Sequence, residues 1–103
     1  MVPESLLDEV ARRFSLLGDP TRLRILSTLH TEGELSVGEL ARRAGVARDN
    51  ASQHLRRLTE AGLLSRRHDG PNVYYAIVDQ SLEQMCDLVC TSLRQRARAL
   101  ASM

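Results

Sequence analysis

Residues 38–64, GELARRAGVARDNASQHLRRLTEAGLL, contain two helical patterns separated by a short break. Leu40, Ala41 and Ala44 give the first pattern one apolar face, and Gly45 interrupts it. The apolar stripe that continues through the second pattern comprises Val46, Ala51, Leu55, Leu58 and Leu63. Two helices joined by a short turn that contains glycine are typical of a helix-turn-helix, in which the second helix lies in a DNA major groove.

The opposite face of the second helix is polar and positively charged. It comprises Arg48, Asn50, Ser52, Gln53, His54, Arg56 and Arg57. Arginine, asparagine and glutamine can hydrogen-bond to base edges, while arginine and hydroxyl groups also contact phosphates. The alternative interpretation is an ordinary helical hairpin with a solvated polar face. We favour DNA binding because the helical pattern, the turn and the polar chemistry agree.

The length and composition of the chain indicate a single domain spanning residues 1–103. Hydrophobic residues make up 43% and charged residues 26%, which is ordinary for a globular protein with one core. No run of about 18 apolar residues is present, so no membrane span is expected. The N-terminal stretch MVPESLLDEV is acidic and lacks an apolar signal core, so we expect a cytoplasmic protein.

Basic charge is concentrated in the middle of the chain, although the formal net charge is only +1. Residues 1–40 carry four arginines and seven acids, which gives −3. Residues 41–68 carry seven arginines and two acids, which gives +5. Residues 69–103 carry three arginines and four acids, which gives −1. A basic segment that coincides with the helix-turn-helix pattern is the charge distribution expected of a DNA-binding protein.

Two further helices are predicted before the helix-turn-helix. Apolar residues recur at helical spacing in residues 4–17, and a second, mostly buried helix follows. Asp19 is a suitable N-cap for that second helix, and Pro20 suits its first position. Ser36 and Glu39, three residues apart, predict a capping box at the start of the third helix.

Two strands and a long helix are predicted after the helix-turn-helix. The strands cover residues 63–68 and 73–78, with a turn at 69–72, and the helix covers residues 79–101. The order ααααββα predicts a mainly α fold with a small β-hairpin, which is a winged helix-turn-helix.

The first strand of this wing carries two adjacent arginines, Arg66 and Arg67. We expect them to contact the DNA backbone rather than bases. Because neighbouring strand residues point to opposite faces, only one of the two is expected to face DNA fully.

The helices at 4–17 and 79–101 carry apolar stripes that extend along most of their length. A domain of this size has little interior to cover both stripes, and an exposed apolar stripe usually marks a partner. We therefore predict a homodimer through these two helices, with purely internal packing as the alternative. The candidate interface residues are Leu6, Val10, Leu82, Met85, Val89 and Leu93.

In these features the chain resembles the ArsR/SmtB family of bacterial dimeric winged-helix repressors, over nearly its whole length. The matching segments are LGDPTRLRILSTL at 17–29, ELSVGELARRAGV at 34–46, NASQHLRRLTEAGLL at 50–64 and RRHDGPNVYYAI at 66–77. The resemblance implies a dimer that binds an imperfect inverted repeat of double-stranded DNA. Each fourth helix would enter a major groove, and each wing would lie along the flanking backbone. An inducer, often a metal ion, would weaken DNA binding.

The common metal sites of that family are incomplete in this sequence. A cysteine pair in the third helix is replaced by Ser36 and Gly38. A site on the last helix retains Asp79, but the other three ligand positions hold Ser81, Ser92 and Gln95. The cysteines of a third site, late in the fourth helix, correspond to Arg57 and Ala61. One carboxylate does not hold a zinc or nickel ion, so the sequence does not identify the effector.

Cys86 and Cys90 are the remaining candidates for an effector site. At positions i and i+4 they lie on neighbouring turns of the last helix, where a disulfide between them is geometrically awkward. If that helix pairs across a twofold axis, thiols from two subunits could bind a soft or transition metal ion, or form a disulfide between chains. The alternative is that both are small core residues. His30, His54 and His68 are scattered over different elements.

An enzyme is not predicted, since the sequence shows no paired carboxylates, nucleophile elbow or glycine-rich phosphate loop. The main rival function is a winged-helix module for protein contacts, for which an apolar or acidic fourth helix would be expected. The fourth helix here is basic, which favours DNA. Within the DNA-binding interpretation, metal sensing, thiol redox sensing and ligand-independent regulation all stay open.

Overall fold

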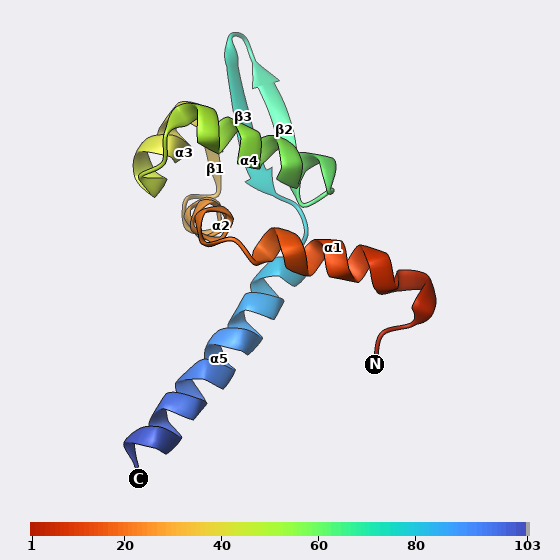
Figure 1. The fold of residues 1–103 in the computed structure, drawn as a ribbon. Coiled ribbons are helices and arrows are strands. Elements are labelled where there is room, and N and C mark those ends of the chain that lie inside the picture. The colour runs from red at the N-terminus through yellow and green to blue at the C-terminus, as the bar shows by residue number, and fades with distance from the viewer. Residues whose placement is uncertain (103) are drawn as a thin grey trace.

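The computed structural model describes residues 1–102, and its elements follow the predicted order with one additional strand (Figure 1). In chain order they are the 3-10 turn η1 (Glu4–Leu6), α1 (Leu7–Leu17), α2 (Pro20–Glu32), β1 (Glu34–Ser36), α3 (Val37–Ala44), α4 (Arg48–Glu60), β2 (Leu64–Asp69), β3 (Asn72–Ile77) and α5 (Ser81–Ala101). None of the helices in this described part of the chain is long and apolar enough to cross a membrane.

Side-chain caps define where α2 and α3 begin, as the sequence predicts. An Asp19 carboxylate oxygen accepts a hydrogen bond from the backbone N–H of Arg22 at 2.9 Å. At the start of α3, the Ser36 hydroxyl accepts from the backbone N–H of Glu39 at 3.3 Å, and the Glu39 carboxylate accepts from the Ser36 backbone N–H at 3.5 Å. Both caps satisfy amide groups that have no partner inside the helix.

The turn between α3 and α4 depends on a left-handed glycine. Gly45 has φ 69° and ψ 38°, a conformation that costs glycine little because it has no Cβ. The next residue, Val46, donates its backbone N–H to the carbonyl of Ala41 at 2.9 Å and packs partly buried against the core. This short turn allows α4 to begin at Arg48, so the predicted helix-turn-helix is confirmed.

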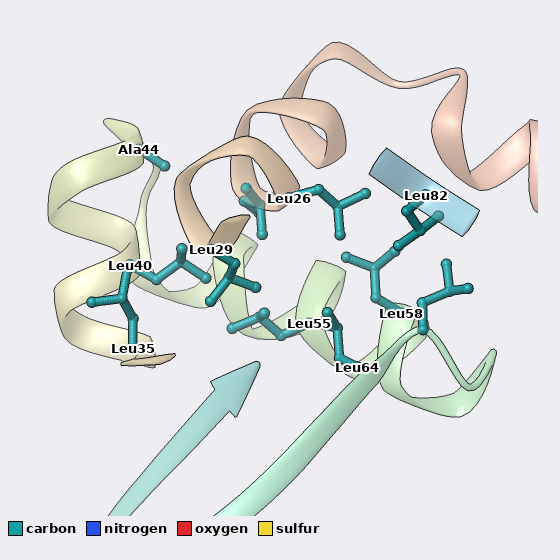
Figure 2. Close-up of a cluster of buried hydrophobic side chains, with 11 residues drawn as sticks. Leu26, Leu29, Leu35, Leu40, Ala44, Leu55, Leu58, Leu64 and Leu82 are labelled. Carbon is teal, nitrogen blue, oxygen red and sulfur yellow. The ribbon is translucent and has the colours of Figure 1, made fainter. Parts of the chain in front are cut away.

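One cluster of leucines joins the helix-turn-helix to the other elements (Figure 2). Its buried members are Ile25, Leu26 and Leu29 of α2, Leu35 of β1, Leu40 and Ala44 of α3, Leu55 and Leu58 of α4, and Leu63, Leu64 and Leu82. Complete burial of a leucine side chain contributes about 1.5–3 kcal/mol, so these contacts dominate the stability of the domain. Leu82 is only 3% exposed within the single chain. Its assignment to the dimer interface is therefore corrected, since its side chain packs in the core.

The sheet has three antiparallel strands in the order β1–β3–β2, rather than the predicted two-stranded hairpin. Tyr75 of β3 pairs with Leu35 on one side and with Arg66 on the other. Gly70 at φ 61° and Pro71 form the turn between β2 and β3. Because β1 follows α2 directly, it ties the base of the wing to the helical core.

Helix α5 leaves the body of the molecule at the base of the wing and extends away from it (Figure 1). Arg13 of α1 fixes this exit point, because its guanidinium donates to the Asp79 carboxylate at 2.6 Å. The same carboxylate accepts from the Ser81 hydroxyl at 2.6 Å and from the Ser81 backbone N–H at 2.9 Å. Asp79 thus accepts from the first backbone amide of α5 and joins this helix to α1.

The ionised form of Asp79 stabilises the fold. Hydrogen bonds from Ser81, with the Arg13 guanidinium nearby, hold the pKa of this carboxyl below its usual range. A lowered pKa adds stability above the pKa of the unfolded chain, about 3.9, and that stability is lost as the pH falls through the folded value. We predict that Asp79→Asn lowers the free energy of unfolding by about 1 kcal/mol at neutral pH, with a smaller deficit at about pH 3.

Urea unfolding at both pH values measures this effect, with Asp8→Asn on the exposed side of α1 as the control. A deficit that is equal at both pH values would contradict an ionised Asp79 as the source.

Candidate nucleic-acid interface

The core contacts of α4 determine which of its side chains face solvent. Ala51, Leu55 and Leu58 are completely buried. On the opposite side of the helix, Gln53 and Arg56 are exposed, as predicted from their spacing. These two side chains therefore lie on the face of α4 that can approach a major groove.

The start of α4 lies beside the tip of the wing. Arg48 and Ser52 line a hollow that also includes Ser36 and Arg42 from the α3 region and Asn72 from the wing. Asn50 is exposed, whereas His54 is half-buried. The hollow is open and polar, so a phosphate could be contacted from α3, α4 and the wing together.

Arg57 lies apart from the other predicted DNA contacts. It lines a separate hollow with Arg12 and Leu16 of α1 and with Glu60. The predicted polar face is thus divided between Arg48 and Ser52 toward the wing, Gln53 and Arg56 in the centre, and Arg57 toward α1.

The structure separates the two wing arginines, as strand alternation predicts. Arg67 donates to both carboxylate oxygens of Glu34, at 2.7 and 3.2 Å, and its guanidinium lies 4.8 Å from the centre of the Tyr74 ring. The hydrogen bond from Arg67 holds the pKa of Glu34 below its usual range, and Glu34 in turn raises the pKa of Arg67. Sequence analysis did not find Glu34, because its position beside Arg67 depends on the third strand, whereas Tyr74 lies directly opposite Arg67 in the predicted hairpin.

Arg66 lies on the other face of the sheet. It lies opposite Tyr75 of β3, which in turn lies opposite the buried Leu35 of β1. Leu64, which is also buried, is two residues before Arg66 and therefore on the same face. This is the face turned toward α3 and α4. Within residues 1–102 Arg66 forms no ion pair, so its charge is available to a phosphate.

The two predicted thiols lie at a groove between α2 and α5. Cys86 is half-buried and Cys90 is exposed, and both line this groove together with His30 of α2. Partial burial raises the pKa of the Cys86 thiol, with a smaller contribution from Cys90. In the part of the chain that the structure describes, no three His, Cys, Asp or Glu side chains are placed to hold a metal ion together.

We predict that the wing contacts DNA through Arg66 and that the Arg67–Glu34 pair contributes little net charge. Arg66→Ala should weaken binding to all duplexes and reduce the slope of log affinity against log salt by about 1. The double variant Glu34→Gln, Arg67→Ala removes one charge of each sign and is the matched control, with a nearly unchanged slope. A fluorescence anisotropy titration at several salt concentrations measures both. Equal losses of DNA affinity in the two variants would show that Arg67 breaks its ion pair with Glu34 and contacts DNA itself.

Comparison with known proteins identifies a domain family and several relatives. A family model described as a helix-turn-helix domain matches residues 17–67. A probable mercury resistance operon repressor from Streptomyces lividans is 33% identical over 99 residues, covering 96% of this chain and 78% of that protein. A homolog of the cadmium resistance regulatory protein CadC from Staphylococcus aureus is 37% identical over 79 residues, covering 77% of this chain and 65% of that protein.

Solved structures of similar sequence have the same fold. The antimony-specific repressor AntR superposes with a TM-score of 0.83 at 30% identity, covering 95% of this chain and 88% of that chain. A homodimeric winged helix-turn-helix domain from Mycobacterium bovis, described as a possible ArsR-family regulator, gives a TM-score of 0.78 at 32% identity, covering 92% and 87%. With its helix-turn-helix, its wing and these relatives, the chain belongs to the ArsR/SmtB family of winged helix-turn-helix, DNA-binding transcriptional repressors.

Proposed function

We propose that this protein represses transcription as a homodimer that binds an inverted-repeat operator and leaves it when an effector binds. The observation that best supports this proposal is the orientation of α4, whose leucines are buried while Gln53 and Arg56 face outward. In a symmetric dimer two such helices enter successive major grooves on one side of the duplex. The cytoplasm, where the chromosome of a bacterium lies, is the expected compartment.

The proposed dimer surface consists of apolar side chains on η1, α1 and α5 that nothing within residues 1–102 covers. The exposed large ones are Leu6, Leu7, Phe14, Leu88, Val89, Leu93 and Leu100. Near the crossing of the two helices, Leu6, Val10 and Phe14 share a hollow with Met85. Exposed apolar surface on this scale marks a protein partner, and a second copy would bury it in a self-complementary contact. The homodimeric Mycobacterium bovis relative supports this arrangement.

Charge supports DNA over a protein as the ligand of α4. Residues 41–68 carry a net charge of +5, and the outward face of α4 is rich in arginine and amide groups. The rival function, a winged-helix module for protein contacts, has no corresponding apolar surface on α4. Each phosphate neutralised by arginine releases a counterion, so binding should weaken steeply as salt increases.

Selection of bound duplexes from a random-sequence library tests the operator directly. A homodimer should enrich an inverted repeat whose half-sites are about one helical turn, or a multiple of it, apart. Enrichment of an isolated half-site would contradict the dimeric mode, and a library with no enrichment at any salt concentration would contradict DNA recognition.

We propose that the effector is a soft metal ion or another thiol-reactive compound. The alternative is that the protein regulates transcription without a ligand. Relatives are named for resistance to mercury and cadmium and for antimony specificity. In this chain Cys86 and Cys90 are the side chains with matching chemistry, and both are free thiols.

We predict that Gln53 contacts a base edge. Gln53→Ala should reduce discrimination between the selected operator and random DNA by about 1–3 kcal/mol, because a bidentate amide contact to adenine is lost. Competition titrations with both DNAs measure the difference. Equal losses on operator and random DNA would place Gln53 on the backbone only.

We predict that Leu93, which is 60% exposed, lies in the dimer interface. Leu93→Glu should convert the dimer to a monomer, because it places a charge in an apolar contact. Thr91→Glu, on the opposite side of α5, is the matched control and should stay dimeric. Sedimentation equilibrium measures both. A dimer of unchanged affinity in Leu93→Glu would exclude this part of α5 from the interface.

A further inference from the structure

The exposed apolar stripe of α5 contains an arginine. Leu93, Arg96 and Leu100 recur at spacings of three and four residues, so they lie on one face of the helix, whereas Arg98 projects from the opposite side. Arg96 is exposed, and within residues 1–102 it forms no ion pair. The α5 face of the proposed dimer contact therefore carries a positive charge among its leucines.

The apolar surface of α1 contains an acid. The hollow at the crossing of α1 and α5 is lined by Leu6, Glu9, Val10, Arg13, Phe14 and Met85. Arg13 is already bound, because its guanidinium donates to the Asp79 carboxylate at 2.6 Å. Glu9 is exposed and forms no ion pair in the part of the chain that the structure describes. The α1 face of the proposed contact therefore carries a negative charge beside its apolar side chains.

These two charges lie too far apart to meet within one chain. Met85 marks the place on α5 that lies beside Glu9, and Arg96 follows it by eleven residues. A helix rises 1.5 Å per residue, so this separation is about 16 Å along α5. Over this distance α5 runs away from α1 (Figure 1). A partner for either charge must therefore come from another molecule.

A twofold axis across α5 brings the two charges together. When a helix pairs antiparallel with its own copy, the residue numbers that face each other have a constant sum. An axis midway between Val89 and Leu93 places Met85 opposite residue 97, so Arg96 of the partner subunit reaches the hollow that holds Glu9. A parallel pair would instead place two copies of Arg96 side by side and leave the α1 hollow uncovered.

We propose that Glu9 of each subunit binds Arg96 of the partner subunit, so that a second copy of this chain lies antiparallel along α5 and covers the α1 hollow. This pairing rests on the homodimer of the proposed function, and it adds the direction of the helices and two ion pairs. The surrounding apolar side chains exclude water, which makes the loss of either charge costly. A related chain without one of the charges forms at most one of the two pairs, so the pairs favour identical subunits.

Charge reversal in the full-length protein tests the pairing by sedimentation equilibrium. Glu9→Arg and Arg96→Glu should each raise the dissociation constant of the dimer by about 30-fold or more, because like charges then face each other in the apolar contact. The combined variant Glu9→Arg, Arg96→Glu exchanges the signs and should dimerise within about fivefold of the wild type. Asp8→Arg and Arg98→Glu make the same charge changes on the opposite sides of α1 and α5, and as matched controls they should dimerise normally.

Mixing the two single variants shows whether the pairs join different subunits. A heterodimer of the Glu9→Arg and Arg96→Glu chains contains one native pair and one pair with exchanged signs. Native mass spectrometry of the mixture should therefore show more heterodimer than either homodimer, a rescue that a misfolded variant would not give. Normal dimerisation of either single variant, or a combined variant as weak as the single variants, would overturn the proposal.

The Leu93→Glu variant separates this proposal from the proposed function. A monomeric Leu93→Glu protein together with normal dimers of both charge-reversal variants would keep α5 in the interface and overturn only the pairing of Glu9 with Arg96. A wild-type protein that stays monomeric at every concentration would overturn the homodimer of the proposed function, and the ion pairs with it.

Discussion

Burial of Leu55 and Leu58 against the leucines of α2 is the contact on which the DNA-binding surface depends. Both side chains are completely buried, and they lie beside Leu26 and Leu29 in one cluster (Figure 2). Rotating α4 about its axis would expose these leucines at a cost of about 1.5–3 kcal/mol each. The hydrophobic contact therefore fixes the rotation of α4, and the position of Gln53 on the outer face follows from it.

The third strand has the corresponding role in the wing. An isolated two-stranded hairpin is at best marginally stable in water, and β1 converts this one into a sheet that begins in the core at Leu35. The same strand places Glu34 where it binds Arg67. The Arg67–Glu34 ion pair therefore stiffens the wing on the face away from α3 and α4. On the opposite face of the sheet, Arg66 is not neutralised by an acidic side chain within residues 1–102.

Features set by neighbouring residues could be predicted from the sequence, and features set by distant contacts could not. The Ser36–Glu39 capping box, the Gly45 turn and the helical periods are local, so their positions were accessible. Strand β1 has three residues and pairs with a strand about forty positions later, so no local pattern marks it. Leu82 and Leu93 share one apolar stripe, but only the fold shows that the first lies in the core and the second is exposed. The thiols of α5 were likewise identifiable, whereas their position beside α2 was not.

Helix α5 is anchored to its own chain at one end only. Leu82 and the Arg13–Asp79 ion pair hold its first turns, and the large side chains beyond them, from Leu88 to Leu100, are exposed. The helix extends away from the body of the molecule (Figure 1). No other element in residues 1–102 packs against the rest of this 21-residue helix, and the proposed partner subunit would set its direction. The α2–α5 groove lies where the internal anchor ends and the partner contact begins. Because only its first turns are anchored, a small change of angle at this point would be amplified along the 21 residues of α5.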